Sequence, residues 1–400
     1  MKRYFTASLI LIFVSILLAQ ELKAIPAFAR KYNMTCKTCH SPFPRLKAYG
    51  DDFAGNGFVL SDQEAPRYYV PTGDDELSLI REFPLAVRMD GFLSYNMGNE
   101  EKPDLGTPYL FKIMSGGEIF ENVAYYFYFY MSERGEVAGV EDAYIMFNNL
   151  FGVDFDIYLG QFQVSDPLFK RELRLTLEDY YVYTSTPWFS NASLKYDRGI
   201  MATLGLETGT DIIFEVINGN GLAEADPNHV FDNDKYKNFA GRISQDVGEY
   251  LRIGVFGYLG NEETTKLFND ASVNVENEVM MVGPDVTLGY DDLVELNVQY
   301  IMRQDKPEFS TEIGIGDEIN TNAALAELIV TPNRDDSKWY GVGMFNWVDS
   351  DLDHLNYQTA SVHIGYLLRR NLRLVGEITY NMTETDDSFA EISIGFVSGF

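Results

Sequence analysis

The sequence predicts a mainly β protein: a transmembrane antiparallel β-barrel of about 16 strands with a small N-terminal α-helical haem-binding plug. Three features of residues 84–400 lead to this prediction. Apolar and polar residues alternate along successive segments, the connections between the segments are alternately short and long, and an amphipathic segment ending in Phe400 closes the chain. A soluble β-sandwich, whose strands also alternate, is the competing fold class.

Residues 1–24 are typical of a secretory signal peptide. Lys2 and Arg3 provide the charged start, the apolar core runs from Leu9 to Leu18, and Leu22-Lys23-Ala24 fits a cleavage site. The apolar run is too short to cross a bilayer comfortably, so we expect cleavage rather than a membrane anchor.

The composition excludes one class of partner. The 400 residues carry a formal net charge of −29, with 60 acidic against 31 basic residues. Nucleic acid binding needs a cationic surface that neutralises phosphates, so we expect no nucleic acid partner.

Residues 25–60 contain the pattern Cys-x-x-Cys-His at Cys36, Cys39 and His40, which is the attachment motif of a c-type haem. The two thiols bond to one porphyrin, and the adjacent imidazole ligates its iron. A structural disulfide, a redox dithiol and half of a zinc site are the alternatives. No second cysteine pair is present to complete a zinc site, and no βαβ setting follows for a redox dithiol. The sequence therefore predicts one covalently bound c-type haem.

The same unit, a monohaem cytochrome c unit at 25–60, is expected to contain two short helices. The first spans about residues 29–39, and Pro42 and Pro44 then interrupt the path. The second begins near Arg45, and its apolar face comprises Leu46, Tyr49, Gly50 and Phe53. So small a unit cannot bury a core alone, so the haem and its surroundings must complete the packing. Residues 61–83 are expected to form a linker.

The barrel is expected to occupy residues 84–400. In its first strand, Leu85, Leu93 and Tyr95 lie on one face and Arg88 and Asp90 on the other, which is the lipid-out, lumen-in pattern of an outer-membrane strand. Strands are expected to begin near residues 84, 108, 123, 138, 153, 199, 210, 238, 250, 277, 293, 323, 338, 357, 372 and 387.

The connections predict how the barrel is oriented. Short turns lie at residues 121–122, 209–210, 290–292 and 370–371, whereas longer loops lie near 97–107, 165–198, 219–237, 261–276, 304–322 and 349–356. An even number of strands with short turns on one side predicts a bacterial outer-membrane location, with both termini on the periplasmic side. The longest connection, 165–198, folds either into the lumen as a constriction or outward, and its sequence favours neither.

The second axial ligand of the haem iron is the next question, because its identity tunes the redox potential. Met34 lies too close to the attachment turn to reach the far face of the haem. Strand parity places four eligible side chains on the lumen face: Met114, Met146, Met201 and His363. Each of them is more commonly a lumen-lining residue than a ligand, and a water-ligated or five-coordinate iron is also open.

The lumen face of the third expected strand carries the aromatic row Tyr126, Tyr128 and Tyr130, beside Lys112 and Arg88. Ordinary packing and charge lining inside a plugged barrel accounts for this row. The functional alternative is contact with the haem, with the basic groups near its propionates.

The N-terminal unit resembles a known family. The residues that carry the likeness are Ile25-Pro26-Ala27-Phe28-Ala29-Arg30, Cys36 to His40, Phe43-Pro44-Arg45-Leu46, Gly50, Phe53 and Gly57-Phe58. They resemble the fused monohaem cytochrome–porins of iron-oxidising bacteria, and over the barrel the likeness is architectural. The resemblance implies that Cys36 and Cys39 hold the haem and that His40 ligates its iron. It also implies electron transfer from an extracellular donor, ferrous iron in the characterised branch, to a periplasmic cytochrome or other carrier. The interval between His40 and Phe43 is shorter than that branch leads us to expect, which leaves the donor open.

We therefore expect an outer-membrane electron carrier that is embedded in lipid and needs no catalytic acid or base, because the metal carries the reaction. Acidic loops such as residues 349–354 would concentrate a cationic donor such as Fe(II). The alternative is a solute-conducting outer-membrane porin in which the haem unit is a structural or sensory plug. A soluble haem protein on a β-sandwich is the third possibility.

Overall fold

The structure, a computed structural model, describes residues 27–32, 34–60, 73, 77, 83–98, 102–268, 271–311, 313–314, 316–383 and 389–400. The signal peptide expected at 1–24 lies outside these residues, as does nearly all of the linker expected at 61–83. No helix in the described ranges has the length and apolar character needed to span a membrane.

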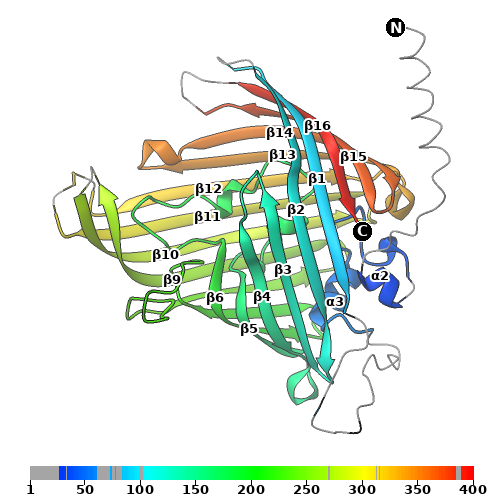
Figure 1. Cartoon of the computed structure of the whole chain (residues 1–400), viewed down its shortest axis with the longest axis horizontal. Helices are drawn as coiled ribbons and strands as arrows, with labels where there is room; N and C mark the ends of the chain where they lie inside the picture. Colours follow the sequence, from blue (N-terminus) through cyan, green and yellow to red (C-terminus); the bar gives the residue numbers. More distant parts are fainter. Residues whose placement is uncertain are drawn as a thin grey trace.

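In the part of the chain that the structure describes, sixteen antiparallel strands form one closed barrel (Figure 1). Each strand pairs with its sequence neighbours, and β1 pairs with β16 to close the barrel. The strands are β1 Leu85–Asn96, β2 Lys102–Phe120, β3 Val123–Glu133, β4 Gly139–Phe147, β5 Phe155–Gln163, β6 Tyr196–Leu206, β7 Thr210–Ile217, β8 Asn238–Val247, β9 Leu251–Phe268, β10 Ala271–Tyr290, β11 Val294–Phe309, β12 Ile319–Val330, β13 Trp339–Ser350, β14 Tyr357–Arg369, β15 Leu372–Asn381 and β16 Ala390–Gly399. The predicted fold class and strand number are confirmed, and the β-sandwich is excluded.

The two faces of the strands follow the predicted alternation. On β1, Leu93 is 49% exposed on the outside, whereas Asp90 is 2% exposed on the inside. Apolar side chains cover the outer face around the barrel, among them Ile200, Phe214, Ile243, Leu259, Val362 and Ile394. An outward apolar face is the pattern of a barrel that sits in lipid.

Several strands are longer than predicted. β9 runs to Phe268 and β10 begins at Ala271, so the loop expected at 261–276 is wrong. Likewise β2 begins at Lys102, and β11 continues to Phe309, inside the loop expected at 304–322. Backbone pairing does not need apolar side chains, so these ladders continue after the apolar alternation ends.

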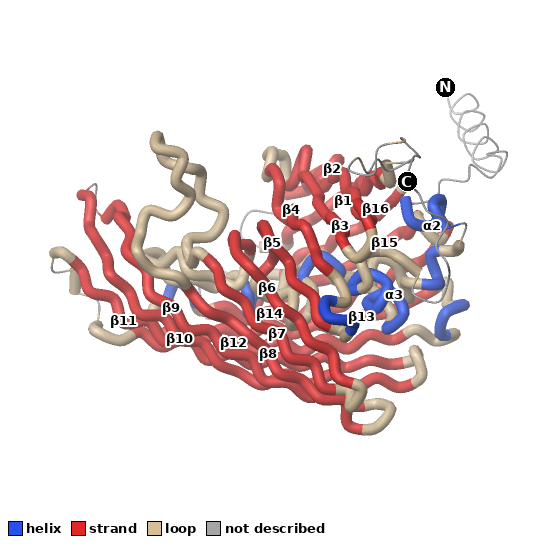
Figure 2. The backbone as a smooth tube through the Cα atoms, turned by 90° about the horizontal axis from the view of Figure 1, so that it is seen from below, coloured by secondary structure: helices blue, strands red, loops and turns tan. Residues whose placement is uncertain are grey.

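The N-terminal helices lie at the end of the barrel where the C-terminus lies (Figures 1 and 2). They are α2 Ala27–Tyr32, the 3-10 turn η1 Cys36–Thr38 and α3 Ala48–Gly55. The single helix expected over 29–39 is therefore split, because Thr35 has an extended backbone before η1. The second helix begins at Ala48 rather than near Arg45, and Tyr49 is exposed, so it does not belong to the buried apolar face.

The long connection between β5 and β6, which we call the lumen loop (residues 164–195), lies inside the barrel. The backbone N–H groups of Leu177 and Glu178 donate to Glu377 on β15, at 2.7 and 2.8 Å. On other strands, Tyr180 donates to Glu327 at 3.0 Å, and Arg303 donates to the backbone carbonyl of residue 192 at 2.7 Å. Contacts to β11, β12 and β15 place the loop across the lumen, which answers the question that the sequence left open.

The lumen loop is also anchored by apolar packing. A buried cluster joins it to strands on several sides of the barrel, through Phe162, Val164, Tyr180, Tyr183, Leu194, Met201, Phe256, Met281 and Met344. At the level of this cluster the barrel interior is packed like a protein core.

Candidate cofactor-binding site

The Cys36–His40 turn is short and internally bonded. The backbone N–H of His40 donates to the carbonyl of Cys36 at 2.9 Å, which brings the ends of the motif together. α3 packs directly on this turn at Gly50, where a β-carbon would lie 2.4 Å from the carbonyl oxygen of Cys39. Only glycine permits so close an approach of the helix to the turn.

The two cysteines are half-buried and not joined in a disulfide. Burial raises the pKa of the Cys36 thiol. Burial and the neighbouring Cys36 likewise raise the pKa of Cys39. Both groups are therefore thiols rather than thiolates at neutral pH.

The His40 side chain is held as a neutral imidazole with one nitrogen free. Its Nδ1 lies 2.8 Å from the carbonyl oxygen of Pro44, so the Nδ1 hydrogen donates to that carbonyl and Nε2 keeps its lone pair. Burial lowers the pKa of His40, which favours the neutral form. A backbone acceptor on the remote nitrogen is the usual way in which a protein orients an imidazole toward a metal.

The turn faces a large cavity between the N-terminal helices and the barrel wall, which we call the main cavity. It encloses about 1400 Å³ of space that protein atoms do not fill, part of which is open to solvent. Its lining includes Cys36, Cys39, His40, Phe28, Leu46, Phe53, Phe58, Ala86, Met114, Tyr126, Tyr128, Tyr144 and Leu173. Two thiols, an imidazole whose Nε2 keeps its lone pair and a broad, largely apolar chamber fit a c-type haem.

Charged groups lie at one side of the main cavity. Arg88, Lys112 and Lys170 line it together with Asp142, Asp166 and Glu172. Lys112 Nζ lies 2.9 Å from a Glu172 carboxylate oxygen, and the Tyr130 hydroxyl donates to the same oxygen at 2.5 Å. Burial alone would raise the pKa of Glu172, but Lys112 and the nearby arginines of the lumen loop lower it, so Glu172 is ionised.

The aromatic row is divided between two places. Tyr126 and Tyr128 line the main cavity with Arg88 and Lys112, as the functional reading of the row requires. Tyr130 is not among the residues that line it. No sequence pattern indicates Glu172 as a site residue, because its position depends on where the lumen loop folds.

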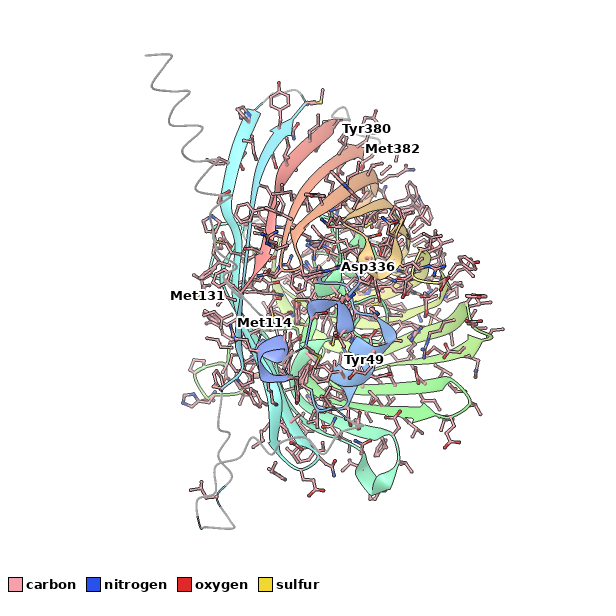
Figure 3. The ribbon with its side chains drawn as sticks, turned by 90° about the vertical axis from the view of Figure 1, so that its right-hand side faces the viewer. Tyr49, Met114, Met131, Asp336, Tyr380 and Met382 are labelled. Carbon is pink, nitrogen blue, oxygen red and sulfur yellow. The ribbon has the colours of Figure 1, made fainter. Side chains whose placement is uncertain are left out.

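The four side chains predicted as candidates for the second axial ligand lie in different surroundings. Of these four, only Met114, on β2, lines the main cavity. Figure 3 places it on the barrel wall beside the N-terminal helices. Met146 is fully buried, and Met201 belongs to the apolar cluster around the lumen loop. His363 has both nitrogens engaged, with Tyr340 at 3.2 Å and Glu377 at 2.8 Å. Met34 also lines the cavity, but from the plug side, next to the motif.

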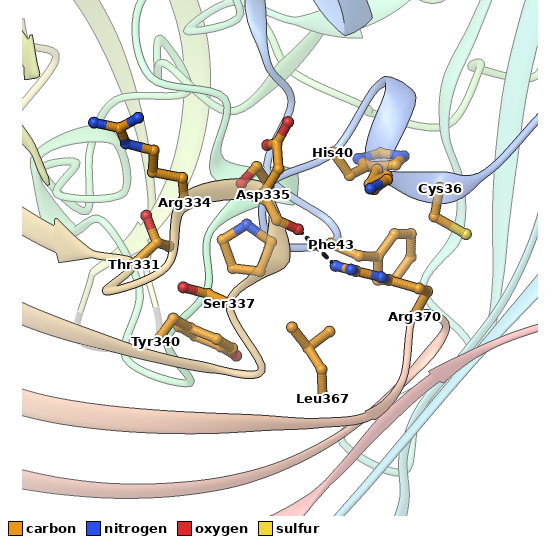
Figure 4. A pocket seen from close by; sticks show the side chains of 13 residues that line it. Cys36, His40, Phe43, Thr331, Arg334, Asp335, Ser337, Tyr340, Leu367 and Arg370 are labelled. Carbon is orange, nitrogen blue, oxygen red and sulfur yellow. Dashed lines mark hydrogen bonds between the residues drawn. The ribbon is translucent and has the colours of Figure 1, made fainter. Parts of the chain in front are cut away.

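A second, smaller pocket lies on the other side of the turn (Figure 4). Cys36 and His40 line it, with Tyr340, Leu367 and Arg370 opposite them. The guanidinium of Arg370 donates to the backbone carbonyl of residue 335 at 2.9 Å. Cys36 and His40 therefore lie between two spaces and line both of them.

Two turns of the barrel hold the N-terminal unit in place. In the β12–β13 connection, Asp335 accepts from Lys47 at 2.6 Å, and Asp336 lies 3.3 Å from Lys37. In the β4–β5 connection, the Asn148 amide donates to the carbonyl of residue 55 at 2.6 Å. These contacts fix the motif relative to the barrel wall that closes the main cavity.

Comparison with known proteins bears on the barrel. The closed sixteen-stranded architecture defines the class: the chain has the fold of bacterial outer-membrane porins. It is similar to a loop L8 deletion mutant of OmpT from Vibrio cholerae, with a TM-score of 0.55 and 12% identity over 80% of this chain and 99% of that one. It is also similar to an anion-selective porin from Comamonas acidovorans, with a TM-score of 0.53 and 12% identity over 80% and 99% of the two chains. The channel DcaP of Acinetobacter baumannii gives a TM-score of 0.52 at 12% identity over 79% and 96%.

No protein-family model matches the chain, and no curated protein matches it either. At identities this low the structural likeness shows the fold alone. The porin part of the resemblance seen in the sequence is thus supported, whereas its cytochrome part remains a prediction.

Proposed function

We propose that the protein is an outer-membrane haem protein of porin fold that passes electrons from an extracellular donor to a periplasmic carrier. The observation that carries this proposal is the main cavity, into which Cys36, Cys39 and His40 all face. Cys36 and Cys39 would form the thioether bonds, and His40 Nε2 would ligate the iron. A bound c-type haem supplies one-electron redox chemistry.

The protein's own residues have three tasks in this proposal. The Pro44 carbonyl keeps the His40 imidazole neutral and oriented. The apolar side chains of the main cavity exclude water from the cofactor. The packed lumen loop restricts the direct passage of solutes, so that charge rather than solute crosses the barrel.

The location of the unit supports the direction of the proposed route. The N-terminal helices lie with the C-terminus at one end of the barrel (Figure 1). Porins carry short turns on their periplasmic side, which would place the haem unit there and the longer loops outside. A net charge of −29 would draw a cationic donor, for which ferrous iron is the leading candidate.

A solute-conducting porin with a haem-bearing structural or sensory plug is the second candidate function. The fold comparisons favour it, because the similar proteins are described as porins and channels. The two candidates share the barrel and the haem and differ in what crosses the barrel.

Two measurements on the purified protein separate these candidates. Rapid mixing with Fe(II) should reduce the haem, which is followed from its absorption spectrum, and solute flux into liposomes should be low. The double variant Cys36→Ser/Cys39→Ser, which keeps the barrel, is the matched control and should show no haem absorption. Absence of reduction by Fe(II) at any accessible pH, together with rapid solute flux, would contradict electron transfer and favour the porin.

A further inference from the structure

A second charged cavity lies between the lumen loop and strands β1–β3 and β14–β16, and we call it the arginine cavity. It comprises about 550 Å³ of space that protein atoms do not fill, part of which is open to solvent. Four arginines line it, in a chain whose net charge is −29. They are Arg88, Arg134, Arg174 and Arg373, and the carboxylates that line it are Asp90, Glu133 and Glu172.

Arg373, on β15, is a buried cation that forms no ion pair with a carboxylate of the described residues. Arg373 is 2% exposed, and its Nη1 donates to the Tyr340 hydroxyl at 2.5 Å. Its Nε is buried and has no hydrogen-bond partner among the described residues. A buried guanidinium that lacks an anion is strongly destabilising, since desolvation of the charge is not offset.

Arg174, on the lumen loop, also has a buried Nε donor that makes no hydrogen bond with the described residues. The carboxylate of Asp179 is 3.8 Å away from this Nε atom. Its Nη1 donates to the carbonyl of Arg171 at 3.0 Å. Two guanidinium groups that line one cavity therefore each present an unused, buried donor.

Two of the cavity's carboxylates are already bound by other cations. Arg88 holds Asp90 through two of its nitrogen atoms, one of them at 2.7 Å. Lys112 and the Tyr130 hydroxyl hold Glu172. Glu133 lies at the end of β3, and no ion pair between it and Arg373 is formed. Among the described residues, no carboxylate therefore pairs with the Nε donor of Arg373.

We propose that the arginine cavity binds a carboxylate group between Arg373 and Arg174. The planar fork of a guanidinium matches a carboxylate in geometry and charge. The carboxylate has two sources with the same chemistry. One is a free small carboxylate that enters the lumen. The other is a propionate of the proposed haem, since Arg88 and Glu172 line both this cavity and the main cavity. Only the second source rests on the proposed function.

The test is calorimetric titration of the purified protein in detergent with acetate and succinate, against chloride at equal ionic strength. Each titration is repeated with Arg373→Met, Arg373→Lys and Arg174→Gln. Arg369→Met, which removes an exposed arginine outside the arginine cavity, is the matched control. The same set is measured in the Cys36→Ser/Cys39→Ser background, and covalent haem is scored separately from the absorption spectrum.

A free carboxylate as the source predicts saturable binding to the wild type that Arg373→Met weakens at least tenfold and Arg369→Met leaves unchanged. A haem propionate as the source predicts no binding to the haem-loaded wild type, and binding to the cysteine variant that Arg373→Met again weakens at least tenfold. Thermal unfolding provides an independent readout. Arg373→Met should lower the midpoint when the carboxylate is bound and raise it when the site is empty. Saturable binding in neither background, or binding that is equal in Arg373→Met, would overturn the proposal.

Discussion

At the scale of single residues, Met114 is the one of the four candidate second axial ligands that lines the main cavity. Strand parity predicts all four, Met114, Met146, Met201 and His363, on the lumen side, and all four side chains are buried or half-buried there. Parity could not say which of them reaches the haem unit, because that depends on where the plug lies along the barrel axis. For the same reason, the sequence does not single out Arg373. Whether a lumen-facing arginine is paired with a carboxylate depends on residues that only the fold brings near it.

Met114 yields a prediction at this scale. If its thioether completes the iron coordination, Met114→Ala should remove the charge-transfer absorption of a methionine-ligated ferric haem and lower the redox potential, because a methionine ligand raises that potential. Redox titration of the covalent haem measures both. Met146→Ala, which removes a buried methionine that does not line the main cavity, is the control. Identical spectra and potentials in the wild type and Met114→Ala would exclude this ligand.

At the scale of elements, the predicted strand starts agree with the structure to within a few residues for most strands. The errors fall where β2, β9, β10 and β11 extend beyond the apolar band, since alternation reports the solvent on each face and not the end of pairing. The lumen loop could not be placed from its sequence, because its position is decided by bonds to β2, β11, β12, β13 and β15.

Glu377 supplies the sharpest test of the lumen loop. Its two carboxylate oxygens accept hydrogen bonds from the backbone N–H groups of Leu177 and Glu178. The Nδ1 atom of His363 lies 2.8 Å from the same carboxylate. Glu377→Gln should weaken this anchor by about 2–4 kcal/mol, because hydrogen bonds to a charged acceptor are lost. We expect faster proteolysis within residues 164–195 and a higher conductance in planar bilayers.

The control for this experiment is Glu391→Gln on β16. Glu391 accepts from Ser393 at 3.2 Å and makes no contact with the lumen loop among the described residues. Equal proteolysis and equal conductance in the two variants would show that Glu377 does not hold the loop.

At the scale of the whole molecule, the interior contains carboxylates whose ionisation opposes folding. Burial raises the pKa of Asp166 on the lumen loop to about 6. The folded state therefore binds the proton more tightly than the unfolded state does. The stability that this group contributes is complete below about pH 4 and is lost as the pH rises through about 6.

Asp166→Asn should remove this pH dependence. The variant should gain about 1–2 kcal/mol over the wild type at pH 7, and the gain should vanish below pH 4. Thermal unfolding in detergent between pH 3.5 and pH 8 measures the difference, and Asp353→Asn, on an exposed loop, is the control. A constant difference across the range would contradict a raised pKa at Asp166.

The two-sided construction of the main cavity has a consequence for biogenesis. One wall comes from residues 27–58 and the other from β1–β4 and the lumen loop, which are synthesised later. On the proposed function, Cys36 and Cys39 would be accessible to a haem-attachment enzyme before the later strands close around them and much less so afterwards. Maturation should therefore be ordered, with attachment preceding barrel closure. Chains that insert into the membrane too early would remain permanently without their cofactor.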